Sequence, residues 1–219
     1  MIPCCVDTEL FSAENVTANE KKDWTEKLKI KTDDLIISYP GSVGTWYMLE
    51  EMITFFNLIS ISYPQAKLLF ITPDDPEKIL SASRKKNIDP IKIIICKAKR
   101  SEMPVLLSLS ALSLFFIKPA YSKKASSPTK MGELMSMGIP FISNSGVGDI
   151  DKLVNDFKVG IAIKDQTEAE YQKAIGLIPS LLEQDSEVSR NVAKTLYSLE
   201  NGVASYRKIY DQIIQNPES

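Results

Sequence analysis

Six short apolar runs, each followed by a stretch with helical character, organise the chain after residue 34. The third run, at 91–96, is continuous and rich in isoleucine, as expected of a parallel strand that is buried on both faces. Strands that alternate with helices are typical of a doubly wound sheet. We therefore predict an α/β fold, a Rossmann-like parallel sheet of about six strands with helices on both faces. The predicted strands are 35–39, 67–72, 91–96, 111–117, 139–143 and 159–163.

The stretches between these strands predict the helices and the domain organisation. We expect a single domain over 1–219, with a lead-in segment and helix at 1–33, a sheet core at 34–164 and C-terminal helices at 165–219. Thr45 is expected to cap a long helix that ends near residue 62. Further helices are predicted at 74–86, 103–109, from 128, at 148–157 and over most of 167–214.

Composition excludes several classes of site and compartment. The chain of 219 residues contains no histidine, which argues against a Ser-His-Asp triad, a histidine zinc site or a histidine general base. Cys4, Cys5 and Cys96 form no disulfide framework and fit a reducing cytoplasm. Uncharged runs such as 103–117 are too short to cross a bilayer, and no signal peptide is evident. We expect a cytoplasmic protein whose membrane association is at most peripheral.

The net charge of −2 conceals a basic central region. Residues 84–130 contain eleven Lys or Arg and two acids, a local charge of +9. The run at 84–86 is interpreted as a solvated basic surface. The other basic residues lie near strand ends and helix starts, where α/β folds bind anions. Nucleic acid is not expected as a partner, because the whole chain is acidic and has no basic-aromatic motif.

The segment 123–142 carries the clearest signal for a ligand. Ser126 or Ser127 is expected to cap a helix whose first turn contains Pro128. The free N–H groups of such a helix start attract phosphate, and Lys130 adds a full positive charge beside them. Together they could neutralise a diphosphate. The alternative is a well-capped structural helix.

Glu133 follows in the same helix, among the apolar neighbours Met131, Leu134 and Met135. A carboxylate in a largely buried helix needs hydrogen-bond partners, and the vicinal hydroxyls of a ribose would supply two donors. A protein donor or solvent is the alternative. Gly132 would allow a ligand or a strand to approach closely, and Gly138 is expected to end the helix.

Two further motifs have structural explanations. Gly41 and Gly44 form a turn between a strand and a helix, a place where α/β folds admit phosphate, but the turn is not a GxGxxG motif. Asp149 and Asp151 match the DxD pattern that holds a metal in some sugar transferases. They follow a glycine-rich turn at a helix start, so N-capping is the preferred explanation and no metal is expected.

These residues together resemble the donor-binding half of GT-B glycosyltransferases of the family 4 type. The resemblance is carried by 127–133 and by 137–148, which match the nucleotide-sugar segment of that family. Residues 2–11, IPCCVDTELF, resemble the "IPNGVDTELF" stretch that opens its C-terminal domain, and 39–42 resemble its "YVGR" stretch. The likeness extends from residue 2 to about 210.

The resemblance implies transfer of a sugar from a nucleotide-sugar to an acceptor such as a growing surface glycan. Members are generally retaining and need neither metal nor another cofactor. It also implies a second Rossmann-like domain, N-terminal and acceptor-binding, which we expect to be absent from this chain. The helices from 188 to 214 would pack back toward that domain. The isolated chain is expected to bind nucleotide and to transfer little or nothing.

Carried over to this sequence, the family pattern implies ribose binding by Glu133 and diphosphate binding by Lys130 and the backbone of 127–129. Lys130 would stabilise the leaving nucleotide, while other catalytic residues stay unassigned. The usual Arg and Lys clamp after the first strand is missing, because Ser42 and Trp46 or Tyr47 occupy those places. The complete set of expected donor-site residues is Gly41, Ser42, Lys97, Arg100, Lys124, Ser126, Ser127, Thr129, Lys130 and Glu133.

Two other functions stay open. The family often has a carboxylate eight residues before the position of Glu133, where this chain has Ala125. Its loss, with that of the clamp, favours a non-catalytic nucleotide-sugar-binding protein. The other alternative is a sugar-nucleotide epimerase of the same fold, which the lack of histidine disfavours. Lys97, Arg100 or Lys124 could replace the clamp.

Overall fold

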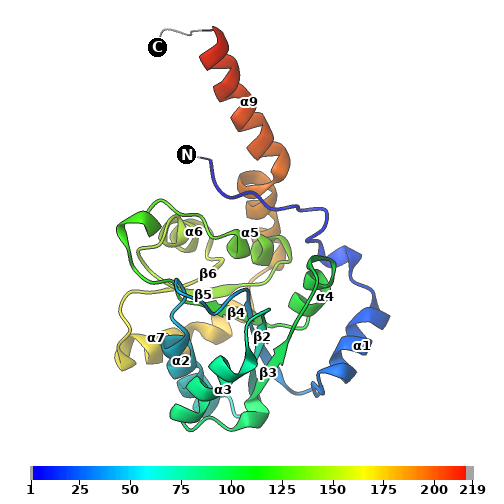
Figure 1. The fold of residues 1–219 in the computed structure, drawn as a ribbon, viewed down its shortest axis with the longest axis vertical. Helices are drawn as coiled ribbons and strands as arrows, with labels where there is room; N and C mark the ends of the chain where they lie inside the picture. The colour runs from blue at the N-terminus through cyan, green and yellow to red at the C-terminus, as the bar shows by residue number, and fades with distance from the viewer. Residues whose placement is uncertain (1, 216–219) are drawn as a thin grey trace.

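A computed structural model describes residues 2–215 and contains one sheet of six parallel strands (Figure 1). The strands lie in the order β3-β2-β1-β4-β5-β6, which confirms the predicted fold class. Their bounds are β1 (Leu35–Pro40), β2 (Ala66–Ile71), β3 (Ile93–Cys96), β4 (Leu112–Phe115), β5 (Phe141–Asn144) and β6 (Gly160–Ile163).

The direction in which strands are added reverses between β1 and β4. The chain builds β1, β2 and β3 toward one edge and then returns to place β4 on the other side of β1. Ile37 pairs with Leu112 across this junction, and the Ser113 hydroxyl donates to the Ser38 carbonyl at 2.8 Å. In open α/β sheets, ligands bind beyond the carboxyl ends of the strands at such a reversal.

Helices cover both faces of the sheet. Figure 1 shows α2, α3 and α7 on one face and α5 and α6 on the other. The helices are α1 (Ala18–Lys27), α2 (Leu49–Ser62), α3 (Pro76–Lys85), α4 (Met103–Leu107), α5 (Thr129–Ser136), α6 (Ile150–Phe157), α7 (Glu168–Leu182), α8 (Ser186–Val192) and α9 (Leu199–Gln215). A 3-10 turn, η3 (Arg100–Glu102), precedes α4, and a π-helical segment, η5 (Ala193–Tyr197), follows α8.

Aromatic side chains fill the core between the sheet and α2 and α7. The Phe55 ring of α2 lies 4.9 Å from that of Tyr171 on α7 and 5.8 Å from that of Phe116 after β4. Phe55 and Phe116 are fully buried. Burial of one such side chain contributes about 1.5–3 kcal/mol, so these contacts fix the positions from which the loops at the sheet edge extend.

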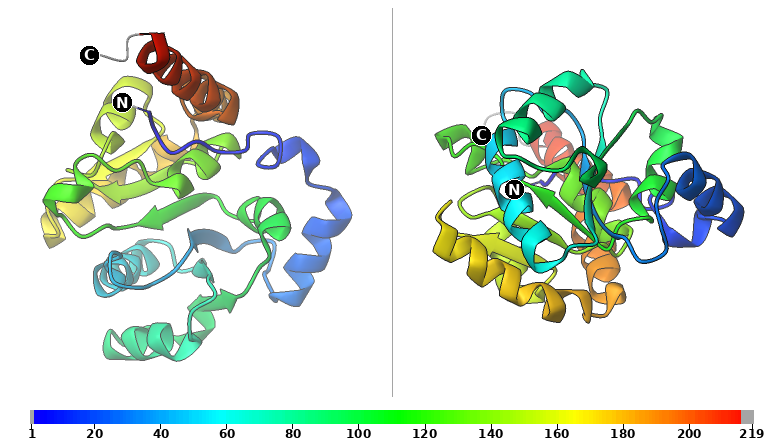
Figure 2. Two further views of the ribbon diagram at one scale, coloured as in Figure 1. Left: turned by 45° about the horizontal axis from the view of Figure 1, so that its top comes forward. Right: turned by 90° about the horizontal axis from the view of Figure 1, so that it is seen from below.

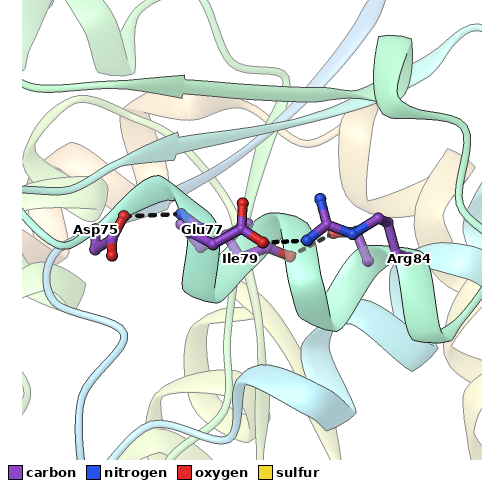
Figure 3. Close-up of polar contacts among 5 residues, drawn as sticks. Asp75, Glu77, Ile79 and Arg84 are labelled. Atoms are coloured by element: carbon purple, nitrogen blue, oxygen red, sulfur yellow. Dashed lines mark hydrogen bonds and ion pairs between the residues drawn. The ribbon is translucent and has the colours of Figure 1, made fainter.

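Local polar contacts define α3 and account for the basic run at its end. Asp75 caps the helix by accepting a hydrogen bond from the Glu77 N–H at 3.0 Å, and Pro76 occupies its first turn. Arg84 forms an ion pair with Glu77 on the exposed face (Figure 3). Lys85 pairs with Glu50 of α2 at 3.3 Å. Ion pairs thus engage two residues of the run 84–86 on the surface.

The N-terminal segment around Val6 and the segment around Tyr197 pair with each other over α5. Val6 forms an isolated parallel bridge with Ser198, in which its N–H donates to the Tyr197 carbonyl at 2.7 Å. Gly132 of α5 lies under this bridge, since a Cβ there would meet Val6 and Tyr197 side-chain atoms at 3.4–3.6 Å. Beyond the bridge, α9 projects from the body (Figures 1 and 2). Within residues 2–215, no helix is long and apolar enough to cross a membrane.

Two helix predictions need correction. The helix expected from Thr45 begins at Leu49, because Tyr47 bridges to Ile117 and the Met48 N–H donates to the Phe116 carbonyl. Neither Ser126 nor Ser127 caps α5; Pro128 holds that place without a side-chain hydrogen bond. The helices predicted over most of 167–214 are confirmed and are α7, α8, η5 and α9. Gly138, at φ +73°, directly follows the last turn of α5, close to its predicted place.

Candidate functional site

A cavity of about 350 Å³ lies where β1, β2 and β3 end and α5 begins. One wall is formed by the carboxyl ends of the strands. Pro40 ends β1 and Gly41 follows it, while Ile71 ends β2 and Thr72 follows it. Ala98 and Arg100 come after β3. Thr129, Lys130 and Glu133 of α5 form the opposite wall. The cavity therefore occupies the carboxyl end of the sheet beside its reversal point.

Lys130 is buried in the wall of this cavity, with 7% of its surface exposed. Its Nζ lies 3.8 Å from the ring centroid of Tyr47, 4.2 Å from that of Tyr39 and 5.7 Å from that of Phe115. We call these three rings the aromatic cage. The Nζ has no hydrogen-bond partner among the described residues. Ring faces attract a cation, but they cannot accept its N–H bonds as oxygen atoms do.

Burial lowers the pKa of Lys130 from its ordinary value to about 7, although the nearby Glu133 carboxylate opposes the shift. The same environment acts on the cage. Burial raises the pKa of the Tyr39 and Tyr47 hydroxyls, so both are neutral at physiological pH. Lys130 is thus a buried basic group whose nearest neighbours are uncharged.

Glu133 lies one turn further along α5 and pairs with Arg100. Arg100 Nη1 is 3.0 Å from Glu133 Oε1. The carboxylate side chain is 10% exposed and the guanidinium side chain 61%. The guanidinium also lies over the Phe11 ring at 5.1 Å. A protein donor therefore engages Glu133, which is one of the alternatives that the sequence left open, and the side chain of this donor is largely exposed.

The turn after β1 supports Lys130 from the other side. Gly41 has φ +116°, and a Cβ at this position would lie 3.3 Å from Lys130 Nζ. Only glycine readily adopts this conformation, and its lack of a side chain leaves room for the amine. Asp74 holds the turn, accepting from Ser42 Oγ at 2.7 Å and from the Val43 N–H at 2.6 Å. The Ser42 hydrogen bond lowers the pKa of Asp74.

The structure brings five of the ten predicted donor-site residues together in the cavity wall: Gly41, Arg100, Thr129, Lys130 and Glu133. Ser42 is engaged by Asp74, and Lys97 is exposed outside the cavity lining. Lys124 lines a separate groove of about 1090 Å³ between α6 and α9. The Ser126 hydroxyl donates to the Lys123 carbonyl, and Ser127 is buried before α5.

Sequence reasoning missed the aromatic cage. Tyr39 and Phe115 belong to β1 and β4, and Tyr47 to the loop before α2. Each resembles an ordinary core residue in sequence. Their common feature appears only in the fold, because β1 and β4 are neighbours at the reversal point.

The two aspartates of the DxD segment accept hydrogen bonds within the protein, but neither is the helix N-cap hydrogen bond that was expected. Asp149 occupies the N-cap position of α6 but makes no side-chain cap; it accepts a hydrogen bond from the Tyr197 hydroxyl. Asp151 accepts from Ser145 Oγ at 2.6 Å and from the Gly146 N–H at 2.8 Å. Among residues 2–215, no group of three or more Cys, Asp or Glu side chains could hold a metal ion.

Comparison with known proteins finds matches to this fold among solved structures. No family model matches the chain, and no curated protein matches it. Solved structures do match. A glycosyltransferase from Rickettsia africae has a TM-score of 0.77 and 18% identity over 98% of this chain and 57% of its own. The HepE protein of Anabaena, solved with UDP-glucose, has a TM-score of 0.73 and 12% identity over 95% of this chain and 56% of its own.

A third structure matches almost completely from end to end. The C-terminal domain of LpcC, a glycosyltransferase group 1 protein from Francisella tularensis, has a TM-score of 0.63 and 18% identity over 89% of this chain and 99% of its own. At these identities the likeness shows the fold. The chain has the Rossmann-like architecture of one half of a GT-B glycosyltransferase, and it spans little more than half the length of the first two proteins.

Proposed function

We propose that this chain is the donor-binding half of a GT-B glycosyltransferase of the family 4 type and that the cavity beside α5 binds a nucleotide-sugar. The observation that carries the proposal is the buried Lys130 amine, which has no hydrogen-bond partner among the described residues and lies at a helix start beside the sheet reversal point. The fold shared with the Rickettsia, Anabaena and Francisella proteins supports it.

The diphosphate would lie between Lys130 and the first turn of α5. The helix start contributes free N–H groups and a favourable dipole, and Lys130 contributes three more donors. Gly41 lets a phosphoryl oxygen approach Nζ without meeting a side chain. As the sugar leaves, negative charge grows on the diphosphate, and fixed donors of this kind stabilise it. No metal is needed for that role, and we infer a retaining transfer from the family resemblance.

The ribose would bind Glu133 in place of Arg100. A carboxylate can accept one hydrogen bond from each vicinal hydroxyl, and the exposed Arg100 can leave because a solvent-accessible ion pair contributes little. Once released, the guanidinium is free to bind a phosphoryl group. Of the three candidates for the missing clamp, Arg100 is thus favoured, since Lys97 and Lys124 do not line the cavity.

The acceptor would bind a second Rossmann-like domain placed against α9. Large apolar side chains of this helix are exposed, including Tyr206, Tyr210 and Ile213. A domain that covers them would bring an acceptor, such as a growing surface glycan, to the donor site. We expect nucleotide binding without appreciable transfer when this chain is alone. The free thiols of Cys4, Cys5 and Cys96 agree with a cytoplasmic location.

A non-catalytic nucleotide-sugar-binding protein is the second candidate. It is favoured by Ala125, which stands where related enzymes often have a carboxylate, and by the missing clamp. Both candidates predict nucleotide binding. Sugar transfer after addition of a GT-B N-terminal half would distinguish them, because the non-catalytic protein would bind the donor and leave it intact.

Calorimetric titration of the chain with UDP, GDP, ADP and CMP tests the proposal. We expect one nucleotide to bind selectively and Glu133→Gln to weaken that binding at least about tenfold, because a hydrogen bond to a charged group contributes about 1.5–3 kcal/mol. Glu77→Gln is the matched control, since Glu77 also pairs with an arginine but lies on α3 outside the cavity. Failure of all four nucleotides to bind, or equal losses in both variants, would contradict the proposal.

A further inference from the structure

Three aromatic rings and the Gly41 turn surround Lys130 Nζ. β1 contributes Tyr39 and β4 contributes Phe115, while Tyr47 comes from the loop before α2. None of these carries a charge at neutral pH. The nearest acid is Glu133 on α5, and Arg100 already forms an ion pair with it at 3.0 Å. Among the described residues, no group accepts a hydrogen bond from the amine, and the nearest carboxylate is already paired.

A charged amine in this place is costly. An ammonium that loses its hydration needs acceptors for its three N–H groups, and a cage of rings supplies attraction without them. Cation–π contact contributes about 0.5–2 kcal/mol, less than the cost of burying an unpaired charge. The neutral amine avoids that cost.

Resting on the function proposed above, we propose that at mildly alkaline pH Lys130 is a neutral amine in the ligand-free protein and that binding of the diphosphate group places a proton on it. The proton comes from solvent and joins the Nζ lone pair, so the bound state contains an ammonium against phosphoryl oxygens. No other bond forms or breaks. Lys130 is thereby a proton-linked anion receptor, and the donor affinity depends on pH.

The direction of that dependence follows from the pKa. Burial places the pKa of Lys130 at about 7 in the empty protein, and an adjacent phosphate raises it. Binding at about pH 8 should then take up close to one proton, whereas binding at about pH 6 should take up almost none. Affinity should fall by up to about tenfold for each pH unit above 7, until the pH reaches the raised pKa of the amine in the complex.

Calorimetry in buffers of different ionisation enthalpy counts these protons. The probe is the sugar ester of the nucleotide that binds in the first titration: UDP-glucose, GDP-mannose or ADP-glucose. Its diester phosphates do not titrate in this range, whereas a terminal phosphate has a second pKa of about 6. The slope of binding enthalpy against buffer ionisation enthalpy should correspond to about one proton at pH 8.

Two variants separate the role of Lys130 from a general effect on the site. Lys130→Met should weaken binding and abolish proton uptake, and a neutral side chain of similar length should fold in the apolar cage. Arg100→Gln should weaken binding yet retain the uptake. For the unchanged protein, a ¹³Cε signal from Lys130 that titrates near pH 7 without ligand is a second readout.

The outcomes are distinguishable. Binding of the nucleotide-sugar at pH 8 without proton uptake would overturn this inference while the proposed function stands. Equal uptake by the Lys130→Met variant would overturn it too, because another group would then be the receptor. If only CMP binds, this inference fails, because CMP has no diphosphate group. If no nucleotide and none of the three nucleotide-sugars binds, the proposed function fails and this inference fails with it.

Discussion

At the scale of single residues, the site depends on what surrounds Lys130. The role of Lys130 as a candidate site residue and its position at a helix start were predictable from the sequence, but its burial was not. Its cage consists of Tyr39, Tyr47 and Phe115, which come from three separate segments. Any one of them is an ordinary core aromatic. The fold converts them into an enclosure, and this is why the amine loses its water.

Lys130 should make stability depend on pH. Its pKa is about 7 in the folded chain and ordinary, near 10.5, in the unfolded chain. Between these values the unfolded chain binds one more proton, so the free energy of unfolding should rise with pH, by at most about 1.4 kcal/mol per unit. Urea unfolding at pH 7 and pH 8.5 should show this rise in the native protein.

The Lys130→Met variant is the control for that measurement. It should be more stable than the native protein at pH 7, and the difference between the two should shrink as pH increases. A constant difference across this range would show that Lys130 stays charged in the folded chain. Measurements stop near pH 8.5 because Cys96, whose pKa burial raises to about 11, opposes the trend once thiols of the unfolded chain ionise.

At the scale of elements, the loop before α5 and the start of α6 are locked together. The Gly148 N–H donates to the Lys123 carbonyl at 3.0 Å, and the Tyr197 hydroxyl donates to Asp149. Burial raises the pKa of Tyr197, and its bond to Asp149 adds to the rise. These contacts connect the segment around Tyr197 to the start of α6, and the start of α6 to the loop before α5.

Two glycines of this region form a matched pair. Gly146 and Gly148 both have positive φ, +80° and +50°. A Cβ at Gly148 would lie 1.7 Å from the Ser126 carbonyl oxygen, whereas a Cβ at Gly146 would meet nothing within 4 Å. Gly146→Ala should cost about 1–2 kcal/mol of unfolding free energy from backbone strain alone. Gly148→Ala should cost clearly more and weaken nucleotide binding. Equal losses in denaturant unfolding would show that the loop is not clamped.

The strands were predictable for a physical reason and some helix starts were not. Buried parallel strands need continuous apolar runs, which are visible in sequence, and all six runs became strands. The start of α2 depends instead on a bridge between Tyr47 and Ile117, residues distant in sequence. The capping prediction at Ser126 and Ser127 was wrong because the Ser126 hydroxyl donates to the Lys123 carbonyl instead, and Pro128 occupies the N-cap position of α5.

At the scale of the whole molecule, α9 differs from the other helices in its exposure. It projects from the body, and its apolar residues Leu199, Val203, Tyr206, Tyr210 and Ile213 recur at spacings of three or four. Such a stripe is normally covered in a folded assembly. This arrangement agrees with the second domain proposed above.

Stability should therefore be insensitive to changes on this stripe. Ile213 is 57% exposed, while Ile178 of α7 is fully buried. Ile213→Ala should change the free energy of unfolding by less than about 0.5 kcal/mol, and Ile178→Ala should cost about 2–5 kcal/mol. A large loss for Ile213→Ala in thermal unfolding would mean that the body of this chain already covers α9.

The central claim is that the cavity beside α5 binds the diphosphate and ribose of a nucleotide-sugar. A crystal structure of the chain with the nucleotide that binds in the titration tests it most directly. The account predicts phosphoryl oxygens within hydrogen-bond distance of Lys130 Nζ, ribose hydroxyls on Glu133 and an Arg100 guanidinium released from that carboxylate. A nucleotide bound elsewhere, such as in the groove between α6 and α9, with Arg100 still on Glu133, would contradict it.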